Sequence, residues 1–120
     1  MPGFDAHYGL ELLSAADGEA RARVRVREHH RQPEGLVHGG LLAAIAESTA
    51  VRATAPAVDG VARGLSVQTS FLRPVTAGDV HALARCRHRG RTTWVWEVDL
   101  SDDEGRLCAL ARVTVAIRPV

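Results

Sequence analysis

The chain has 120 residues, a formal net charge of +1, an apolar fraction of 46% and a charged fraction of 24%. This length fits one domain, residues 1–120, and the composition excludes a disordered, collagen-like or coiled-coil protein. The near-neutral charge gives no reason to expect nucleic acid as a partner, and no apolar run reaches the roughly 18 residues that span a bilayer. Because the first residues lack the basic stretch and apolar core of a signal peptide, we expect a cytoplasmic protein with no membrane partner.

The first third of the chain indicates two strands and a loop. Tyr8 to Leu13 is a short strand candidate, and Asp17-Gly18 favours a turn. Residues 20–27 alternate apolar side chains with arginines, and this period of two predicts a half-buried strand with a solvated arginine row. Residues 28–38 have no periodicity and are expected to form a loop.

Residues 39–54 are rich in leucine and alanine and form the only good helix candidate, closed by Pro56 and Asp59-Gly60. Four strand candidates follow, separated by tight turns: Leu65–Leu72, Val80–His88, Thr92–Leu100 and Leu107–Ile117. Tight turns favour antiparallel pairing. We therefore expect an α+β fold in which a curved antiparallel sheet wraps around one helix of small side chains.

One helix leaves a sheet face and a sheet edge uncovered, so we expect a homodimer. The two cysteines, Cys86 and Cys108, lie in apolar runs and are expected to be buried free thiols. His29, His30 and His38 lack acidic or cysteine partners at ligand spacing, so we expect no metal site.

The segment around the start of the helix candidate carries the most chemical information. Gly39-Gly40 open the helix, where unpaired N–H groups at the positive end of the helix dipole can hold an oxyanion. Gln32 and His38 lie in the loop just before, and Glu47 is a carboxylate in an otherwise small and apolar helix. Purely structural interpretations of these residues stay open: a tight entry turn at the glycines, a helix cap at His38 and a solvated position for Glu47.

The neighbours of Glu47 one helical turn away are all uncharged: Ala43, Ala44, Ala50 and Val51. We therefore expect Glu47 to be partly buried, which raises a carboxylate pKa and suits a base or nucleophile. From His38 to Glu47 an ideal helix rises roughly 13 Å and turns about half a revolution. Glu47 therefore cannot reach a carbonyl held at Gly39 of its own chain. If both groups serve one reaction, they come from two chains across a dimer interface.

The segment QPEGLVHGGLLAAIAES resembles the signature of hotdog-fold acyl-CoA thioesterases. The most similar groups are the phenylacetate-degradation type, the 4-hydroxybenzoyl-CoA type found in Arthrobacter and the 1,4-dihydroxy-2-naphthoyl-CoA type. The downstream segments FLRPVTAGD, RHRGRTTWVWEV and GRLCALARVTVAI extend the likeness over nearly the whole chain. The resemblance implies a six-stranded antiparallel sheet around one long central helix, paired into homodimers and dimers of dimers.

The resemblance also implies hydrolysis of an acyl-CoA, or an acyl group on a carrier protein, with no metal and no cofactor beyond the coenzyme A of the substrate. Glu47 then matches the catalytic carboxylate, as nucleophile or general base, and the Gly39 N–H polarises the thioester carbonyl. Gln32 orients that carbonyl or the carboxylate, and His38 has a supporting role near the sulfur. Residues matching segments that contact coenzyme A in relatives are Gly64, Phe71, Leu72, Arg73, Pro74, His88, Arg89, Gly90, Arg91, Thr92 and Thr93.

Two positions depart from this pattern. Val51 stands where relatives often carry a water-positioning Ser or Thr, for which Ser48 or Thr49 could substitute, and Phe71 stands where some relatives carry His. Both changes make the site more apolar. They keep open a non-catalytic acyl-CoA or acyl-carrier-protein binding or proofreading protein of the same fold, whereas a dehydratase is the weaker third reading. Aryl, short-chain and polyketide-type acyl groups all remain candidate substrates.

Overall fold

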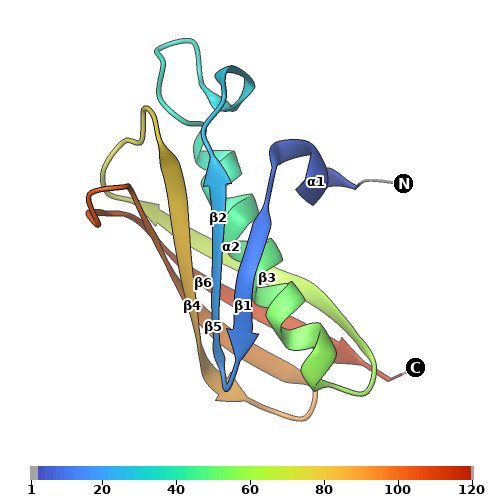
Figure 1. The fold of residues 1–120 in the computed structure, drawn as a ribbon. Coiled ribbons are helices and arrows are strands. Elements are labelled where there is room, and N and C mark those ends of the chain that lie inside the picture. The colour runs from blue at the N-terminus through green and yellow to red at the C-terminus, as the bar shows by residue number, and fades with distance from the viewer. Residues whose placement is uncertain (1–2, 120) are drawn as a thin grey trace.

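The computed structural model describes residues 3–119 and contains one six-stranded antiparallel sheet in the order β1-β2-β4-β5-β6-β3 (Figure 1). In chain order the elements are α1 (Phe4–Tyr8), β1 (Glu11–Ala16), β2 (Glu19–Arg25), the 3-10 turn η1 (Glu28–His30), α2 (Gly39–Thr54), the 3-10 turn η2 (Ala55–Ala57), β3 (Val61–Phe71), β4 (Asp79–Arg89), β5 (Thr93–Ser101) and β6 (Leu107–Arg118). The predicted α+β architecture, a six-stranded antiparallel sheet around one long helix, is confirmed.

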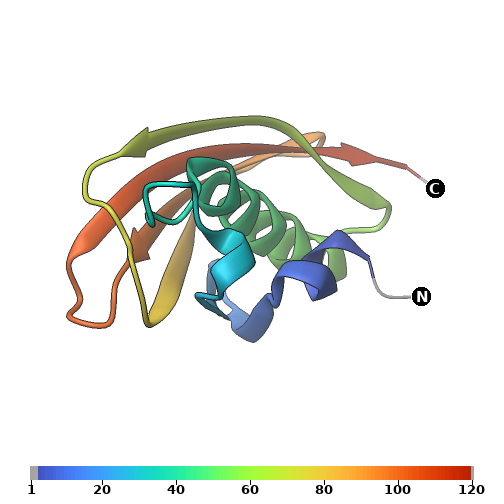
Figure 2. The ribbon, with the colours of Figure 1, turned by 90° about the horizontal axis from the view of Figure 1, so that it is seen from above.

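Helix α2 lies in the concave side of the sheet (Figure 2). Its inner face is made of small and medium side chains, and Ile45, Ala46 and Ala50 are completely buried. Small residues let the strands approach the helix closely enough to exclude water from the core. At the end of the helix, the Trp96 indole N–H donates to the Thr54 hydroxyl at 2.9 Å, which satisfies a polar group inside the core.

The period-two patterns place apolar and charged side chains as predicted. Along β5 every second side chain is apolar, faces the helix and is at most 3% exposed: Trp94, Trp96, Val98 and Leu100. The arginines of β2 stay on the outer face and pair with acidic neighbours there, including Arg23 with Glu11 at 3.3 Å and Arg25 with Asp79 at 2.8 Å. The arginine row is therefore a solvated face, as expected.

The structure corrects the start of the chain. Tyr8 does not begin a strand but ends α1, and its hydroxyl donates to the Ala44 carbonyl across 3.4 Å. Gly9 follows with a φ of +92°, a left-handed conformation that suits glycine and stops the helix. The first strand therefore begins only at Glu11.

Of the two cysteines predicted to be buried, only one is. Cys108 is buried, and that burial raises the pKa of its thiol. Cys86 is half-buried and lies next to the irregular pairing of β4 with β5 between Cys86 and His88. A similar irregularity turns Leu107 away from the face of Ala109, so that Leu107 is 37% exposed.

Strand β3 lies at an edge of the sheet and pairs with β6 on one side only. It presents several apolar side chains to solvent, among them Leu65 at 65% and Phe71 at 57% exposed. Exposed apolar side chains on an unpaired edge strand are typical of an interface. Neither α1 nor α2 has the length and hydropathy needed to cross a membrane, and the same holds for every other helix within residues 3–119.

Candidate active site

The loop before α2 has a defined backbone conformation. The Gln32 N–H donates to the Leu36 carbonyl at 2.7 Å, and the Gly35 N–H donates back to the Gln32 carbonyl at 2.9 Å. The Val37 N–H donates to the Val75 carbonyl at 2.8 Å, which fastens the loop to the segment between β3 and β4. Gln32 and His38 both lie in this loop, which leads into the first turn of the helix.

His38 caps α2, one of the alternatives that the sequence left open. Its Nδ1 accepts a hydrogen bond from the Gly40 N–H at 2.9 Å, so in this arrangement Nδ1 carries no hydrogen and the ring hydrogen is on Nε2. The N–H groups of both glycines were expected to be free, but that of Gly40 is engaged by this cap. The Gly39 N–H takes part in no hydrogen bond within residues 3–119 and remains the donor at the positive end of the helix.

The ring of Phe71 covers Gly39. A Cβ atom at Gly39 would lie 2.8 Å from Phe71 Cζ and 3.1 Å from its Cε1, closer than such contacts normally come. A larger residue than glycine at this position would therefore force the ring to move. The benzyl group forms an apolar wall next to the free N–H.

A cavity of about 510 Å³ opens at this end of the helix. It brings together seven of the residues predicted for the site: Gln32, His38, Gly39, Phe71, Leu72, Arg73 and Pro74. Gly40, which the sequence singled out together with Gly39, also lines it, whereas no sequence signal pointed to Leu36, Val37, Leu42 or Val75. The cavity is of the size that small-molecule sites usually have, with an apolar lining and a few convergent polar groups.

Glu47 lies outside this cavity, on the side of α2 that faces β3. Its carboxylate rests against Gly64, where an added Cβ would lie 2.9 Å from Glu47 Cδ and 3.0 Å from Cγ. Within the single chain the Glu47 side chain is exposed, so the predicted partial burial is not found. The reason is that nothing in one chain covers this face of α2 beside the free edge of β3.

The hydroxyl groups next to Glu47 are already engaged. The Ser48 hydroxyl donates to Asp5 Oδ1 at 2.7 Å, and the buried Thr49 hydroxyl donates to the Ile45 carbonyl at 2.6 Å. Both hydroxyl groups thus donate their hydrogen within the chain.

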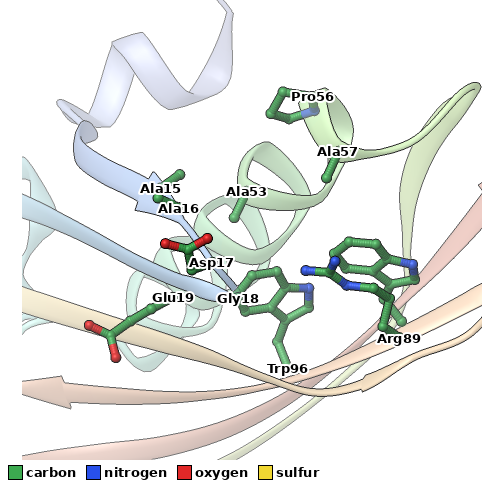
Figure 3. Close-up of a pocket in the computed structure, with 11 residues that line it drawn as sticks. Ala15, Ala16, Asp17, Gly18, Glu19, Ala53, Pro56, Ala57, Arg89 and Trp96 are labelled. Carbon is green, nitrogen blue, oxygen red and sulfur yellow. The ribbon is translucent and has the colours of Figure 1, made fainter.

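The turn between β4 and β5 lies at the opposite end of α2. The Arg89 guanidinium stacks over the Trp94 ring, 4.4 Å from its centroid, and lines a smaller cavity of about 210 Å³ beside Ala53 and Pro56 (Figure 3). The residue as a whole stays exposed. Arg91 is exposed and forms no ion pair within the described residues.

One cluster of potential metal ligands was missed by the sequence analysis: Asp79, His81 and Asp103. His81 Nε2 lies 2.7 Å from Asp103 Oδ1, and the hydrogen bond from His81 holds the pKa of that carboxyl below its usual value. Arg25 pairs with Asp79 at 2.8 Å. The hydrogen bond between His81 and Asp103 and the ion pair of Asp79 with Arg25 explain why these partly exposed side chains lie close together.

A sequence model described as the thioesterase superfamily matches residues 34–109. The chain is 32% identical to a 1,4-dihydroxy-2-naphthoyl-CoA hydrolase of Listeria monocytogenes, over 97% of this chain and 96% of that protein. It is 33% identical to the proofreading thioesterase EntH of Cronobacter turicensis, over 92% of this chain and 82% of that protein. The crystal structure of a mutant of thioesterase PA1618 from Pseudomonas aeruginosa superposes with a TM-score of 0.93 at 35% identity, covering 97% of this chain and 86% of that one.

Proposed function

The chain belongs to the thioesterase superfamily, and on this premise we propose that it is an enzyme that cleaves an acyl-CoA thioester, with its active site shared between two chains. The hotdog fold and thioester hydrolysis follow from family membership. The finer proposal rests on one observation: Gln32, His38 and the free Gly39 N–H line one cavity, whereas Glu47 lies outside it on an uncovered face. A second copy of the chain can supply the missing carboxylate.

The contacts between α2 and β3 support a twofold arrangement. In one chain Phe71 covers Gly39, and Gly64 backs Glu47. The proposed dimer pairs β3 antiparallel with its own copy about a twofold axis midway between Gly64 and Phe71. Because these two residues contact Glu47 and Gly39, the midpoint of that helix segment, Ala43, then lies near the same axis. Rotation about an axis through these midpoints brings the partner's Glu47 opposite Gly39.

The surface near this axis suits close pairing. Ala43 is small and half-buried, and Leu65 on the edge strand is 65% exposed. Pairing would cover both and would also complete the hydrogen bonding of β3. The partner's Glu47 would then be enclosed beside the cavity, which is the environment the sequence predicts for a catalytic carboxylate.

In this arrangement the substrate carbonyl oxygen accepts a hydrogen bond from the Gly39 N–H, and the Gln32 amide orients the carbonyl. The partner's Glu47 either attacks the carbonyl carbon, expelling the thiolate and forming an anhydride that water opens, or takes a proton from the attacking water. His38 Nε2–H can donate to the departing sulfur. One oxyanion donor such as the Gly39 N–H contributes about 10²–10³ in rate.

Coenzyme A carries phosphate groups that arginines bind well. Arg73 is exposed at the rim of the cavity, and Arg91 is exposed on the β4–β5 turn. That turn lies far from the cavity of its own chain, but the proposed twofold would bring the partner's turn to the end of the dimer where the cavity opens. We therefore propose that two arginines bind the phosphates: Arg73 of the chain that forms the cavity, and Arg91 of the partner subunit.

The alternative is a binding or proofreading protein that holds an acyl-CoA or acyl carrier protein without cleaving it. Val51, in place of a hydroxyl that positions water, is the observation that favours it. A thiol-release assay with a panel of aryl-, short-chain and polyketide-type acyl-CoAs separates the two. We expect thiol release from the native chain and a loss of about 10³ in Glu47→Gln. Binding without thiol release would establish the alternative, and an unchanged rate in Glu47→Gln would refute our catalytic assignment.

A further inference from the structure

We propose that His30 is a positioning residue that holds the loop carrying Gln32 and the first turn of α2 in the reactive arrangement. This inference rests on the proposed function, because it concerns the loop of that same site. His30 itself does not line the cavity. It acts through the residues that do.

His30 is tied to the end of β2 by two reciprocal hydrogen bonds. The Arg27 N–H donates to His30 Nδ1 at 3.0 Å, and the His30 N–H donates to the Arg27 carbonyl at 3.0 Å. The residue is only 5% exposed. The imidazole therefore closes the short turn η1 and fixes the direction in which the chain leaves the sheet.

From His30 a series of hydrogen bonds leads to the start of the helix. The His38 N–H donates to the His30 carbonyl at 2.9 Å, and His38 Nδ1 in turn accepts from the Gly40 N–H at 2.9 Å. Gly39 lies between these two anchored residues. A shift of His30 therefore moves the N–H group that we assign to the oxyanion.

The other side of the ring faces α1. His30 Nε2 is buried toward the backbone of Tyr8 and makes no hydrogen bond of ordinary geometry within the described residues. Tyr8 in turn contacts Ala44 of α2 through its hydroxyl. His30 thus lies where α1, the loop and the helix meet, and the ring has little room to move.

The charge state of the ring matters for this role. Burial, followed by the neighbouring His29, holds the pKa of His30 below its ordinary value, and the positive charges of Arg27 and Arg31 act in the same direction. The ring is therefore neutral at neutral pH, and its Nδ1 can accept the Arg27 N–H. The His29 ring packs edge-on against it at 4.3 Å between centroids but is itself exposed.

Two conservative substitutions test the assignment at the level of single atoms. His30→Asn keeps an acceptor near the position of Nδ1, whereas His30→Gln keeps a polar side chain of similar size but moves its acceptor toward the position of Nε2. His29→Ala removes the exposed neighbouring ring and serves as the matched control. For each variant, kcat and KM are measured with an acyl-CoA that the native chain cleaves, and amide hydrogen exchange is measured at His38 and Gly40.

We expect His30→Gln to lose about tenfold or more in kcat with KM nearly unchanged, because even a displacement of about 1 Å is costly in a reacting site. The His38 and Gly40 amides should exchange faster in this variant. His30→Asn should recover both properties to within about threefold, and His29→Ala should change neither. Equal behaviour of the Asn and Gln variants, or native exchange rates in His30→Gln, would overturn the proposal.

The exchange measurement separates this inference from the proposed function. If the native chain releases no thiol from any acyl-CoA, faster exchange in His30→Gln that is restored in His30→Asn still supports the positioning role. If thiol is released but the exchange rates do not respond, the proposal for His30 fails alone.

Discussion

Gly64→Ala offers a sharp test of how Glu47 is placed. The added Cβ would lie 2.9 Å from Glu47 Cδ, whereas carbon atoms prefer a separation of about 3.5–4.0 Å, so the carboxylate has to move by about 0.6–1.1 Å. A displacement of this size in a reacting group can cost about a hundredfold in rate. Because only the end of one flexible side chain has to move, we expect Tm to change by no more than about 4 °C.

The assay is thiol release, with kcat compared in four chains: native, Gly64→Ala, Glu47→Gln and the double variant. If alanine acts by displacing the carboxylate, it should lower kcat about 30- to 100-fold in the native background and cost nothing further once Glu47 is replaced. A native rate in Gly64→Ala would refute the reasoning. So would an equal loss in both backgrounds, because the effect would then not pass through Glu47.

Three further predictions concern other contacts. Gly39→Ala places its Cβ 2.8 Å from Phe71 Cζ and should lower kcat for thiol release about tenfold or more. Adding Phe71→Ala should restore part of this activity. If no activity is restored, the ring is not the obstacle. Arg91→Ala should raise KM for an acyl-CoA by about 3- to 10-fold at low salt, and the difference from the native chain should vanish at high salt. The matching acyl-pantetheine lacks the nucleotide phosphates, so an equal rise in its KM would exclude a phosphate contact. Burial opposes ionisation of Asp102, but hydrogen bonds from the Arg106 backbone and guanidinium prevail and hold its pKa below 3.8. The charged form therefore stabilises the fold above the unfolded pKa, and this stabilisation is lost as the pH falls through the folded value. Asp102→Asn should lower Tm by about 2–4 °C at pH 7, and thermal melts should show the deficit shrinking below pH 4.

The regular elements were predictable because their signals are local. Alternation along residues 20–27 and 92–100 records which side chains face the core, and that pattern requires no knowledge of the partner strands. The helix bounds followed from Gly39 at the start and Pro56 beyond the end. Helix α1 carries no such signal, because its five residues are held by contacts such as that of Tyr8 with Ala44.

The site was predictable as a set of residues but not as an arrangement. The resemblance pointed to Gln32, His38, Gly39 and Glu47, yet the exposure of Glu47 depends on whether a second surface covers it, which counting neighbours along a helix cannot show. The contact of Gly64 with Glu47 joins residues that are distant in sequence and belong to different elements. The sequence alone also cannot show that Arg89, a predicted coenzyme A contact, stacks on Trp94, or that the buried His30 accepts from the Arg27 N–H.

The central claim is that each active site takes its carboxylate from one chain and its oxyanion loop from the other. The direct test mixes two inactive chains, Glu47→Gln and the double variant Gln32→Ala/His38→Ala, unfolds them together and refolds them as mixed assemblies. Random pairing of equal amounts makes about half of the dimers mixed, each with one intact site, so about a quarter of the native activity should return. A mixture that stays as inactive as its two components would contradict the shared site.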